Sequence, residues 1–152
     1  MGFGDVVSQT IFFIAILGIS VTLIMLFNNY VSSASASIES SRSRMVDQMS
    51  THFDITNVYH ENNTNTTHVY VLNTGESKIM PEDMDAYINS RFVPRTEINA
   101  SVVPSTDVRD EGIWNPGETM YMYINMSLED EIHSIDVVAP NGVSDSDVFS
   151  FS

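Results

Sequence analysis

The chain has 152 residues, no cysteine and a formal net charge of −14, with 6 Lys+Arg against 20 Asp+Glu. Without cysteine it has neither disulfides nor thiolate metal sites, and such an acidic surface repels nucleic acid, which we exclude as a partner. This length fits one small domain and a helix, and is too short for two ordinary domains.

The charge balance bears on the medium around the protein. Lys78 is the only lysine, and most charged residues are acidic. An acidic, lysine-poor surface suits a high-salt medium, where screening relieves self-repulsion. An exterior rich in divalent cations is the alternative, and composition leaves both open.

The N-terminal segment is uncharged and mostly apolar over the 21 residues from Val6 to Leu26, and the next charged residue after Asp5 is Glu39. A helix of that length spans about 30 Å, the thickness of a hydrocarbon core. No basic residue precedes Arg42 and the run is longer than that of a secretory signal, so we expect it to be retained. We predict a transmembrane helix over 1–27, whose spanning residues include Val6, Ile11, Phe12, Phe13, Ile14, Leu17, Ile19, Leu23, Ile24 and Leu26.

Residues 28–50 are rich in serine and contain neither Gly nor Pro. Val31, Ile38 and Met45 recur every seven residues, which favours a helix with one narrow apolar stripe. The small residues from Ser32 to Ser37 allow a second helix to approach closely. We therefore predict a helical stalk that self-associates, as a dimer or in a filament. A flexible serine-rich stalk is the alternative.

The pattern changes to a period of two from Phe53 onward. The clearest case is Glu118–Met126, where apolar Met120, Met122 and Ile124 alternate with polar or aromatic residues. Short strands spaced by turns, with no helical period between them, are typical of an immunoglobulin-like sandwich. The fold class is therefore α+β by segment: a long N-terminal transmembrane α-helix, followed by an all-β sandwich over 51–152. The expected strands are 53–58, 67–72, 85–89, 91–94, 97–103, 118–126, 132–138 and 143–152.

Two observations bear on which side of the membrane this head lies. Four Asn-x-Ser/Thr sequons are candidate N-glycosylation sites and favour an exterior head. Arg42 and Arg44 follow the apolar run with nothing basic before it, which favours the opposite orientation. We expect the head to lie outside the cell. The sequon asparagines are Asn62, Asn65, Asn99 and Asn125.

Residues that carry chemistry are scarce. There is no Gly-x-Ser-x-Gly elbow, no phosphate-binding glycine loop and no His-Glu-x-x-His motif. His60 and His68 could face each other across a hairpin, but two ligands make a weak metal site. The acidic clusters do not have the spacing of a calcium loop. We expect no catalytic residue, cofactor or metal site, and hence no enzyme.

Three turns, together with the opening helix, resemble one known group of proteins. They are Val69-Tyr-Val-Leu-Asn-Thr-Gly75, Trp114-Asn-Pro-Gly-Glu-Thr119 and Ala139-Pro-Asn-Gly-Val143. With the start Met1-Gly-Phe-Gly-Asp-Val-Val, they are similar in order and spacing to the archaellin-related families of archaea. The chain resembles especially the archaellum (archaeal flagellum) accessory proteins of the FlaF and FlaG type, with the FlaF type nearest.

The resemblance implies a structural protein with a single membrane span and a head at the cell surface. In that family it is a stator of the motility machinery that binds S-layer protein, other archaellum components and itself. Asn73, Thr74, Gly75 and Trp114 are then candidate partner contacts, although Trp114 also fits a cap on the core. The alternative is a filament subunit, archaellin or archaeal type IV pilin-like, that assembles through its N-terminal helix. A tethered extracellular enzyme or solute binder is a third class.

Overall fold

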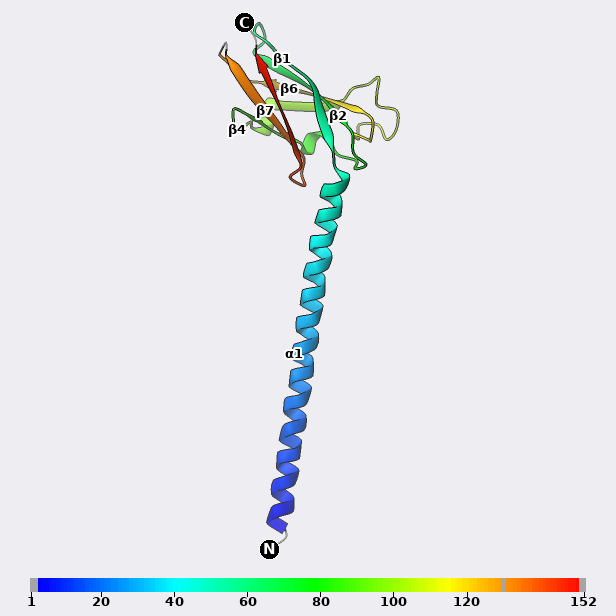
Figure 1. Cartoon of the computed structure of the whole chain (residues 1–152), viewed down its shortest axis with the longest axis vertical. Helices are drawn as coiled ribbons and strands as arrows, with labels where there is room; N and C mark the ends of the chain where they lie inside the picture. The colour runs from blue at the N-terminus through cyan, green and yellow to red at the C-terminus, as the bar shows by residue number, and fades with distance from the viewer. Residues whose placement is uncertain (1–2, 130, 151–152) are drawn as a thin grey trace. The chain divides into compact units, whose positions relative to one another are not determined.

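The computed structural model describes residues 3–129 and 131–150, and it begins with one long helix. Helix α1 runs without a break from Phe3 to Ser50 (Figure 1). The residues of the predicted stalk, 28–50, lie within α1. The chain divides into two compact units, Met1–Ser43 and Arg44–Ser152. The second unit begins seven residues before the predicted boundary at 51, because the last turns of α1 hydrogen-bond to the sandwich.

Three hydroxyl side chains in the apolar part of α1 are satisfied by the helix itself. The hydroxyls of Thr10, Ser20 and Thr22 donate to the carbonyls four residues earlier, at 2.8, 2.8 and 2.9 Å. Such bonds remove the main cost of placing Ser and Thr in an apolar medium. Among the described residues, α1 is the one helix long and apolar enough to cross a membrane, and its most apolar window is not buried in the protein.

The head consists of eight strands and two short 3₁₀ helices, and it agrees with the predicted all-β sandwich. The 3₁₀ helices are η1 (Pro81–Asp83) and η2 (Arg95–Glu97). The strands are β1 (Phe53–Glu61), β2 (Thr66–Asn73), β3 (Asp85–Ile88), β4 (Arg91–Phe92), β5 (Ile98–Val102), β6 (Thr119–Asn125), β7 (Ile132–Val138) and β8 (Ser144–Ser150).

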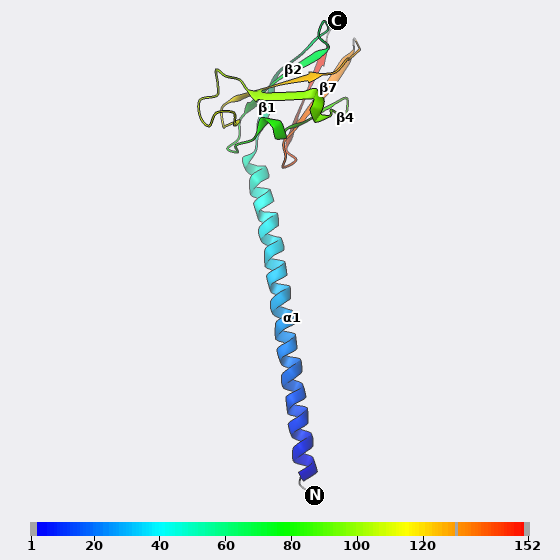
Figure 2. The ribbon, with the colours of Figure 1, turned by 180° about the vertical axis from the view of Figure 1, so that it is seen from behind.

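The strands form two antiparallel four-stranded sheets. Sheet 1 has the order β1-β2-β6-β5 and sheet 2 has the order β4-β3-β7-β8. Strands β1, β2, β4 and β7 are labelled in both views of the head (Figures 1 and 2). This is the immunoglobulin order, with β4 as an extra strand beside β3. Because the chain has no cysteine, no disulfide joins the two sheets. The side chains of the two inner faces supply the whole core.

Alternation along the strands decides which side chains form that core. In β6, Met120, Met122 and Ile124 are fully buried, while Tyr121 and Tyr123 lie on the outer face of sheet 1. The buried apolar side chains of both sheets form one continuous cluster. Sheet 1 therefore has a closed inner face and an outer face rich in tyrosine.

Three predicted strands differ from the observed ones by more than one residue at an end. Strand β1 extends to Glu61, three residues beyond the predicted end at 58. The strand predicted over 91–94 is only β4, because Val93 is followed by Pro94, which has no N–H to donate, and the chain turns into η2. The strand predicted over 143–152 is observed as β8, and its residues 151–152 lie outside the described part of the chain.

Strand β1 contains a bulge that the alternation does not predict. The register with β2 shifts between Ile55 and Asn57. Next to the bulge, the Ile55 N–H donates to Asp145 Oδ2 of β8 at 2.7 Å. A β8 side chain thus satisfies a backbone donor of β1 and joins one edge of sheet 1 to one edge of sheet 2.

Candidate functional site

The three turns that carry the family resemblance lie together where the chain passes from α1 into the sandwich. The turn after β2 contacts the segment before β6 through Asn73, whose Nδ2 donates to the carbonyls of Ser77 (2.9 Å) and Trp114 (3.2 Å). The Asn73 carbonyl accepts from the Gly117 N–H at 2.8 Å. Two motifs 40 residues apart in sequence therefore form one hydrogen-bonded unit.

Gly75 is required by a close approach of two backbones. A Cβ atom at this position would lie 2.4 Å from His52 N and 2.6 Å from Ser50 O. The Gly75 N–H donates to His52 O at 2.8 Å, and the next residue, Glu76, donates its N–H to Ser50 O at 2.8 Å. The β2 turn thus supplies donors to the last carbonyl of α1, that of Ser50, which has no partner within the helix, and to the carbonyl of His52 just beyond it.

Glu118 organises the loop between β5 and β6. Its carboxylate accepts hydrogen bonds from the N–H groups of Val108, Arg109 and Asn115 and from Asn115 Nδ2, at 2.9–3.3 Å. Burial by itself raises the pKa of this carboxyl, but the bonds from Asn115, Val108 and Arg109 outweigh burial and lower it below its usual range. The side chain is therefore an ionised anchor for the loop.

Trp114 belongs to the same loop and lies entirely within the head. Its indole Nε1 donates to Glu118 O at 2.8 Å, and its ring packs against Phe53 with centroids 5.7 Å apart. Its backbone pairs with Ile79 in an isolated bridge. Of the two interpretations of Trp114, the structure agrees with the cap on the core.

The third motif holds the last turn of α1 through Asn141. Asn141 Nδ2 donates to Asp47 O (3.1 Å) and to Thr51 Oγ1 (2.8 Å), while Gln48 Nε2 donates to Asn141 O (2.9 Å). The hydroxyl of Thr51, which is 2% exposed, donates in turn to Asp47 O at 2.7 Å. All of these residues belong to the unit Arg44–Ser152.

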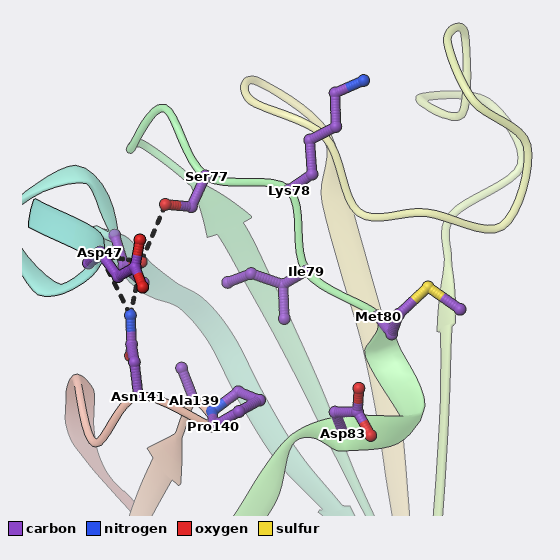
Figure 3. A pocket seen from close by; sticks show the side chains of 10 residues that line it. Asp47, Ser77, Lys78, Ile79, Met80, Asp83, Ala139, Pro140 and Asn141 are labelled. Atoms are coloured by element: carbon purple, nitrogen blue, oxygen red, sulfur yellow. Dashed lines mark hydrogen bonds between the residues drawn. The ribbon is translucent and has the colours of Figure 1, made fainter. Parts of the chain in front are cut away.

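A shallow pocket of about 310 Å³ opens between these turns (Figure 3). In Figure 3 the Asp47 and Asp83 carboxylates lie on different sides of it, and Ile79, Ala139 and Pro140 form part of its wall. The Lys78 ammonium points away from the pocket and pairs with Asp110. The pocket therefore combines one short apolar wall with two separated acidic groups.

The four predicted partner contacts do not form one exposed surface. Asn73 is 2% exposed and Trp114 is fully buried, so neither side chain can form a contact surface in the folded head. Gly75 offers only backbone, which already bonds to His52. Only Thr74 of the four is exposed.

The histidines predicted to face each other across the first hairpin lie on opposite faces of sheet 1. His60 is the register partner of Thr67, and its Nδ1 lies 2.9 Å from that hydroxyl. His68 is the register partner of Tyr59, on the outer face. Within residues 3–129 and 131–150, no group of three or more His, Asp or Glu side chains could hold a metal ion.

The outer face of sheet 1 carries a row of aromatic rings that sequence reasoning missed. His68 stacks on Tyr59 with centroids 4.6 Å apart, and its Nδ1 lies 2.6 Å from Tyr121 OH. Tyr121 in turn contacts Tyr70 and Tyr123, with centroids 5.0 and 6.2 Å apart. Burial raises the pKa of the Tyr121 phenol, with smaller contributions from Tyr70, Tyr123 and Glu61, so it stays neutral. The alternating tyrosines of β6 were the available signal.

The sequon asparagines and the predicted spanning residues of α1 are all accessible. Asn62 and Asn65 lie in the turn between β1 and β2, Asn99 lies on β5 and Asn125 ends β6. The predicted spanning residues are exposed along α1, from 48% for Leu17 to 68% for Phe12. Such a surface needs an apolar environment, either lipid or other helices.

Comparison with known proteins gives one family and a consistent fold. The family described as archaeal-type flagellin matches residues 2–149. A search of curated proteins found no match. The FlaG archaellum periplasmic stator protein from Sulfolobus acidocaldarius is 20% identical, with a TM-score of 0.52, over 65% of this chain and 99% of that one.

A second solved structure is similar over more of the chain. The archaeal flagellum of Methanospirillum hungatei strain JF1 is 11% identical, with a TM-score of 0.66, over 96% of this chain and 93% of that one. At these identities the likeness shows the fold: an apolar N-terminal helix followed by a β-sandwich. Since the family match extends over nearly the whole length, the chain belongs to the archaeal-type flagellin family and is an archaellum-related structural protein.

Proposed function

We propose that this protein is a static, membrane-anchored part of the archaellum whose sandwich lies outside the cell and binds S-layer protein. The observation that carries the proposal is the change in α1 after Phe27. The strongly apolar run extends for about one bilayer thickness, and the following 23 helical residues, Asn28–Ser50, are rich in serine and include Glu39, Arg42, Arg44 and Asp47.

The second half of α1 supports an anchor rather than a packed filament. Val31, Ile38 and Met45 are exposed on one stripe, and the serines between them bond back to the helix, as Ser37 Oγ does to Ser33 O at 3.0 Å. A narrow stripe fits one neighbouring helix. In a packed filament, a helix that contacts several copies of itself needs apolar residues around more of its surface.

Labelling of the single lysine tests the orientation. Lys78 is about half exposed, and a membrane-impermeant amine reagent added to intact cells should modify it if the head is outside. A Lys78→Arg variant is the control, since any remaining signal then comes from the N-terminus. Labelling of Lys78 only after the cells are lysed would overturn the proposed location.

S-layer binding is tested with the full-length chain in nanodiscs mixed with isolated S-layer at native salt. The exposed loop around Val108, which is 78% exposed, is the proposed contact, together with Thr74. We expect co-sedimentation, and we expect Val108→Ser to weaken it. Val148→Ser, the same substitution at an exposed position on β8, is the control and should leave co-sedimentation unchanged. Absence of co-sedimentation would contradict the stator role.

A filament subunit remains the second candidate, favoured by the helix-plus-head likeness to the Methanospirillum flagellum over 96% of this chain. Copy number separates the two roles. Thousands of copies per cell, recovered in sheared filaments, would indicate a filament subunit. A few copies per archaellum, retained in the membrane, would indicate the anchor.

A further inference from the structure

The register of sheet 1 brings two distant sequons to one tyrosine. Asn125 follows Tyr123 by two residues on β6, and Asn99 of β5 is the register partner of Tyr123. Residues two apart on a strand, and residues directly opposite on neighbouring strands, project from the same face about 5–7 Å apart. Tyr123, which is 38% exposed, is therefore flanked by two exposed asparagines.

The acceptor groups at these two positions are open. The serines that complete the sequons, Ser101 and Ser127, are both exposed. A glycosyltransferase reads the asparagine together with the hydroxyl two residues later, so both elements are within its reach at Asn99 and at Asn125.

The two sequons in the hairpin turn are less suited. Asn65 has a left-handed backbone, with φ of 52°, and Thr67, the hydroxyl of its sequon, is fully buried beside His60. Asn62 and Thr64 of the other sequon are exposed, but the Thr64 hydroxyl already donates to the Glu61 carboxylate at 2.9 Å. The sequence offers the four sequons as equal candidates, and their surroundings in the structure favour the strand pair.

We propose that Asn99 and Asn125 are the N-glycosylated positions of this protein, and that their sugars pack on the ring of Tyr123. The donor class is a lipid-phosphate-linked oligosaccharide. A new bond joins the asparagine Nδ2 to the sugar C1, the C1–O bond to the lipid phosphate breaks, the phosphate leaves with that electron pair, and a base of the transferase takes the amide proton. The proposal rests on the exterior location proposed above.

The physical reason for packing is the shape of both partners. A pyranose ring has a face of C–H groups that lies flat on an aromatic ring, and the contact removes apolar surface of both from water. The ring of Tyr123 lies next to that of Tyr121, with centroids 6.2 Å apart, and is therefore the end of the aromatic row on sheet 1. The sugars would therefore cover the exposed end of that row.

The first experiment measures occupancy on the full chain purified from its native membranes, by intact mass and by mass spectrometry of the proteolytic peptides. We expect glycan on Asn99 and Asn125, and we expect a double Asn99→Gln/Asn125→Gln variant to lose it. The matched Asn62→Gln/Asn65→Gln variant should keep it. A chain labelled at Lys78 from outside but bearing no sugar, or sugar only in the hairpin turn, would overturn this inference while leaving the proposed function intact.

The second experiment tests the packing on Tyr123. Removal of both strand sequons should lower the melting temperature of the glycosylated protein by about 2–4 °C. In a Tyr123→Thr background the same removal should cause no shift. Phe92→Thr, a change at an exposed aromatic residue on β4 of the other sheet, is the control and should preserve the shift. An equal shift with and without Tyr123 would overturn the packing.

Discussion

Gly75 shows how one residue without a side chain decides the path of the chain. A methyl group there would overlap backbone atoms of Ser50 and His52, and backbone cannot rotate away as a flexible side chain can. Gly75→Ala should therefore lower the free energy of unfolding by about 1–3 kcal/mol, measured by chemical denaturation of the detergent-solubilised protein. Thr74→Ala, at the exposed neighbour, should change it by less than about 0.5 kcal/mol. Equal effects of the two changes would contradict this account.

Glu118 makes the loop between β5 and β6 sensitive to acid. Its folded-state pKa lies below the ordinary value of 4.5, so its contribution to stability is complete above that pH and is lost as the pH falls further through the lowered pKa. Trp114 is the only tryptophan and its indole N–H bonds to Glu118 O, so its fluorescence reports on the loop.

We expect the emission of Trp114 to shift to longer wavelength on acidification below pH 4.5 in the wild type. In Glu118→Gln the shift should already be present at pH 7, because an amide accepts with one atom where the carboxylate accepts with two. Glu97→Gln, a change at an exposed glutamate of η2, should behave like the wild type. Identical acid profiles in Glu118→Gln and wild type would disprove the role of Glu118.

Elements could be predicted well from the sequence where one face of a strand is buried. The alternation in β6 and β7 gave their ranges to within about two residues, and the uncharged run with its polar continuation gave α1. The bulge near Thr56 was missed because nothing in the local pattern marks it, and the Asp145 side chain that bonds beside it is distant in sequence. The grouping of the three turns, and the burial of Asn73, were also missed, because hydrogen bonds between turns follow from the packed fold rather than from local pattern.

The stripe on the second half of α1 makes a prediction about association. Ile38 is 68% exposed and lies midway between Val31 and Met45. If the stripe packs against a second copy, Ile38→Asn should weaken the association at least tenfold, measured by cross-linking or sedimentation of the full chain in detergent. Ser40→Asn, at an exposed position off the stripe, is the control. Unchanged association in Ile38→Asn would show that the stripe is not the interface.

The whole molecule is dominated by negative charge. All of the 20 acidic residues except Asp5 and Glu39 lie in the unit that contains the sandwich. Raising NaCl from about 0.1 to 1 M shortens the screening length from about 10 to 3 Å, which relieves repulsion between these groups. We expect the melting temperature to rise with salt, by about 4–8 °C for each 1 kcal/mol by which the free energy of unfolding increases. KCl at the same concentrations is the control and should give the same rise, because screening depends on ionic strength. A melting temperature independent of salt would contradict this expectation.

The contact between Gly75 and the end of α1 has a consequence for how such chains diverge. The turn and the helix exit are a matched pair: a substitution that adds a side chain at 75 can be tolerated only if residues 50–52 move as well. A sequence change at residue 75 is thus tied to a change at residues 50–52. Relatives with a bulkier residue at this turn should therefore have a different backbone path over the positions that correspond to residues 50–52.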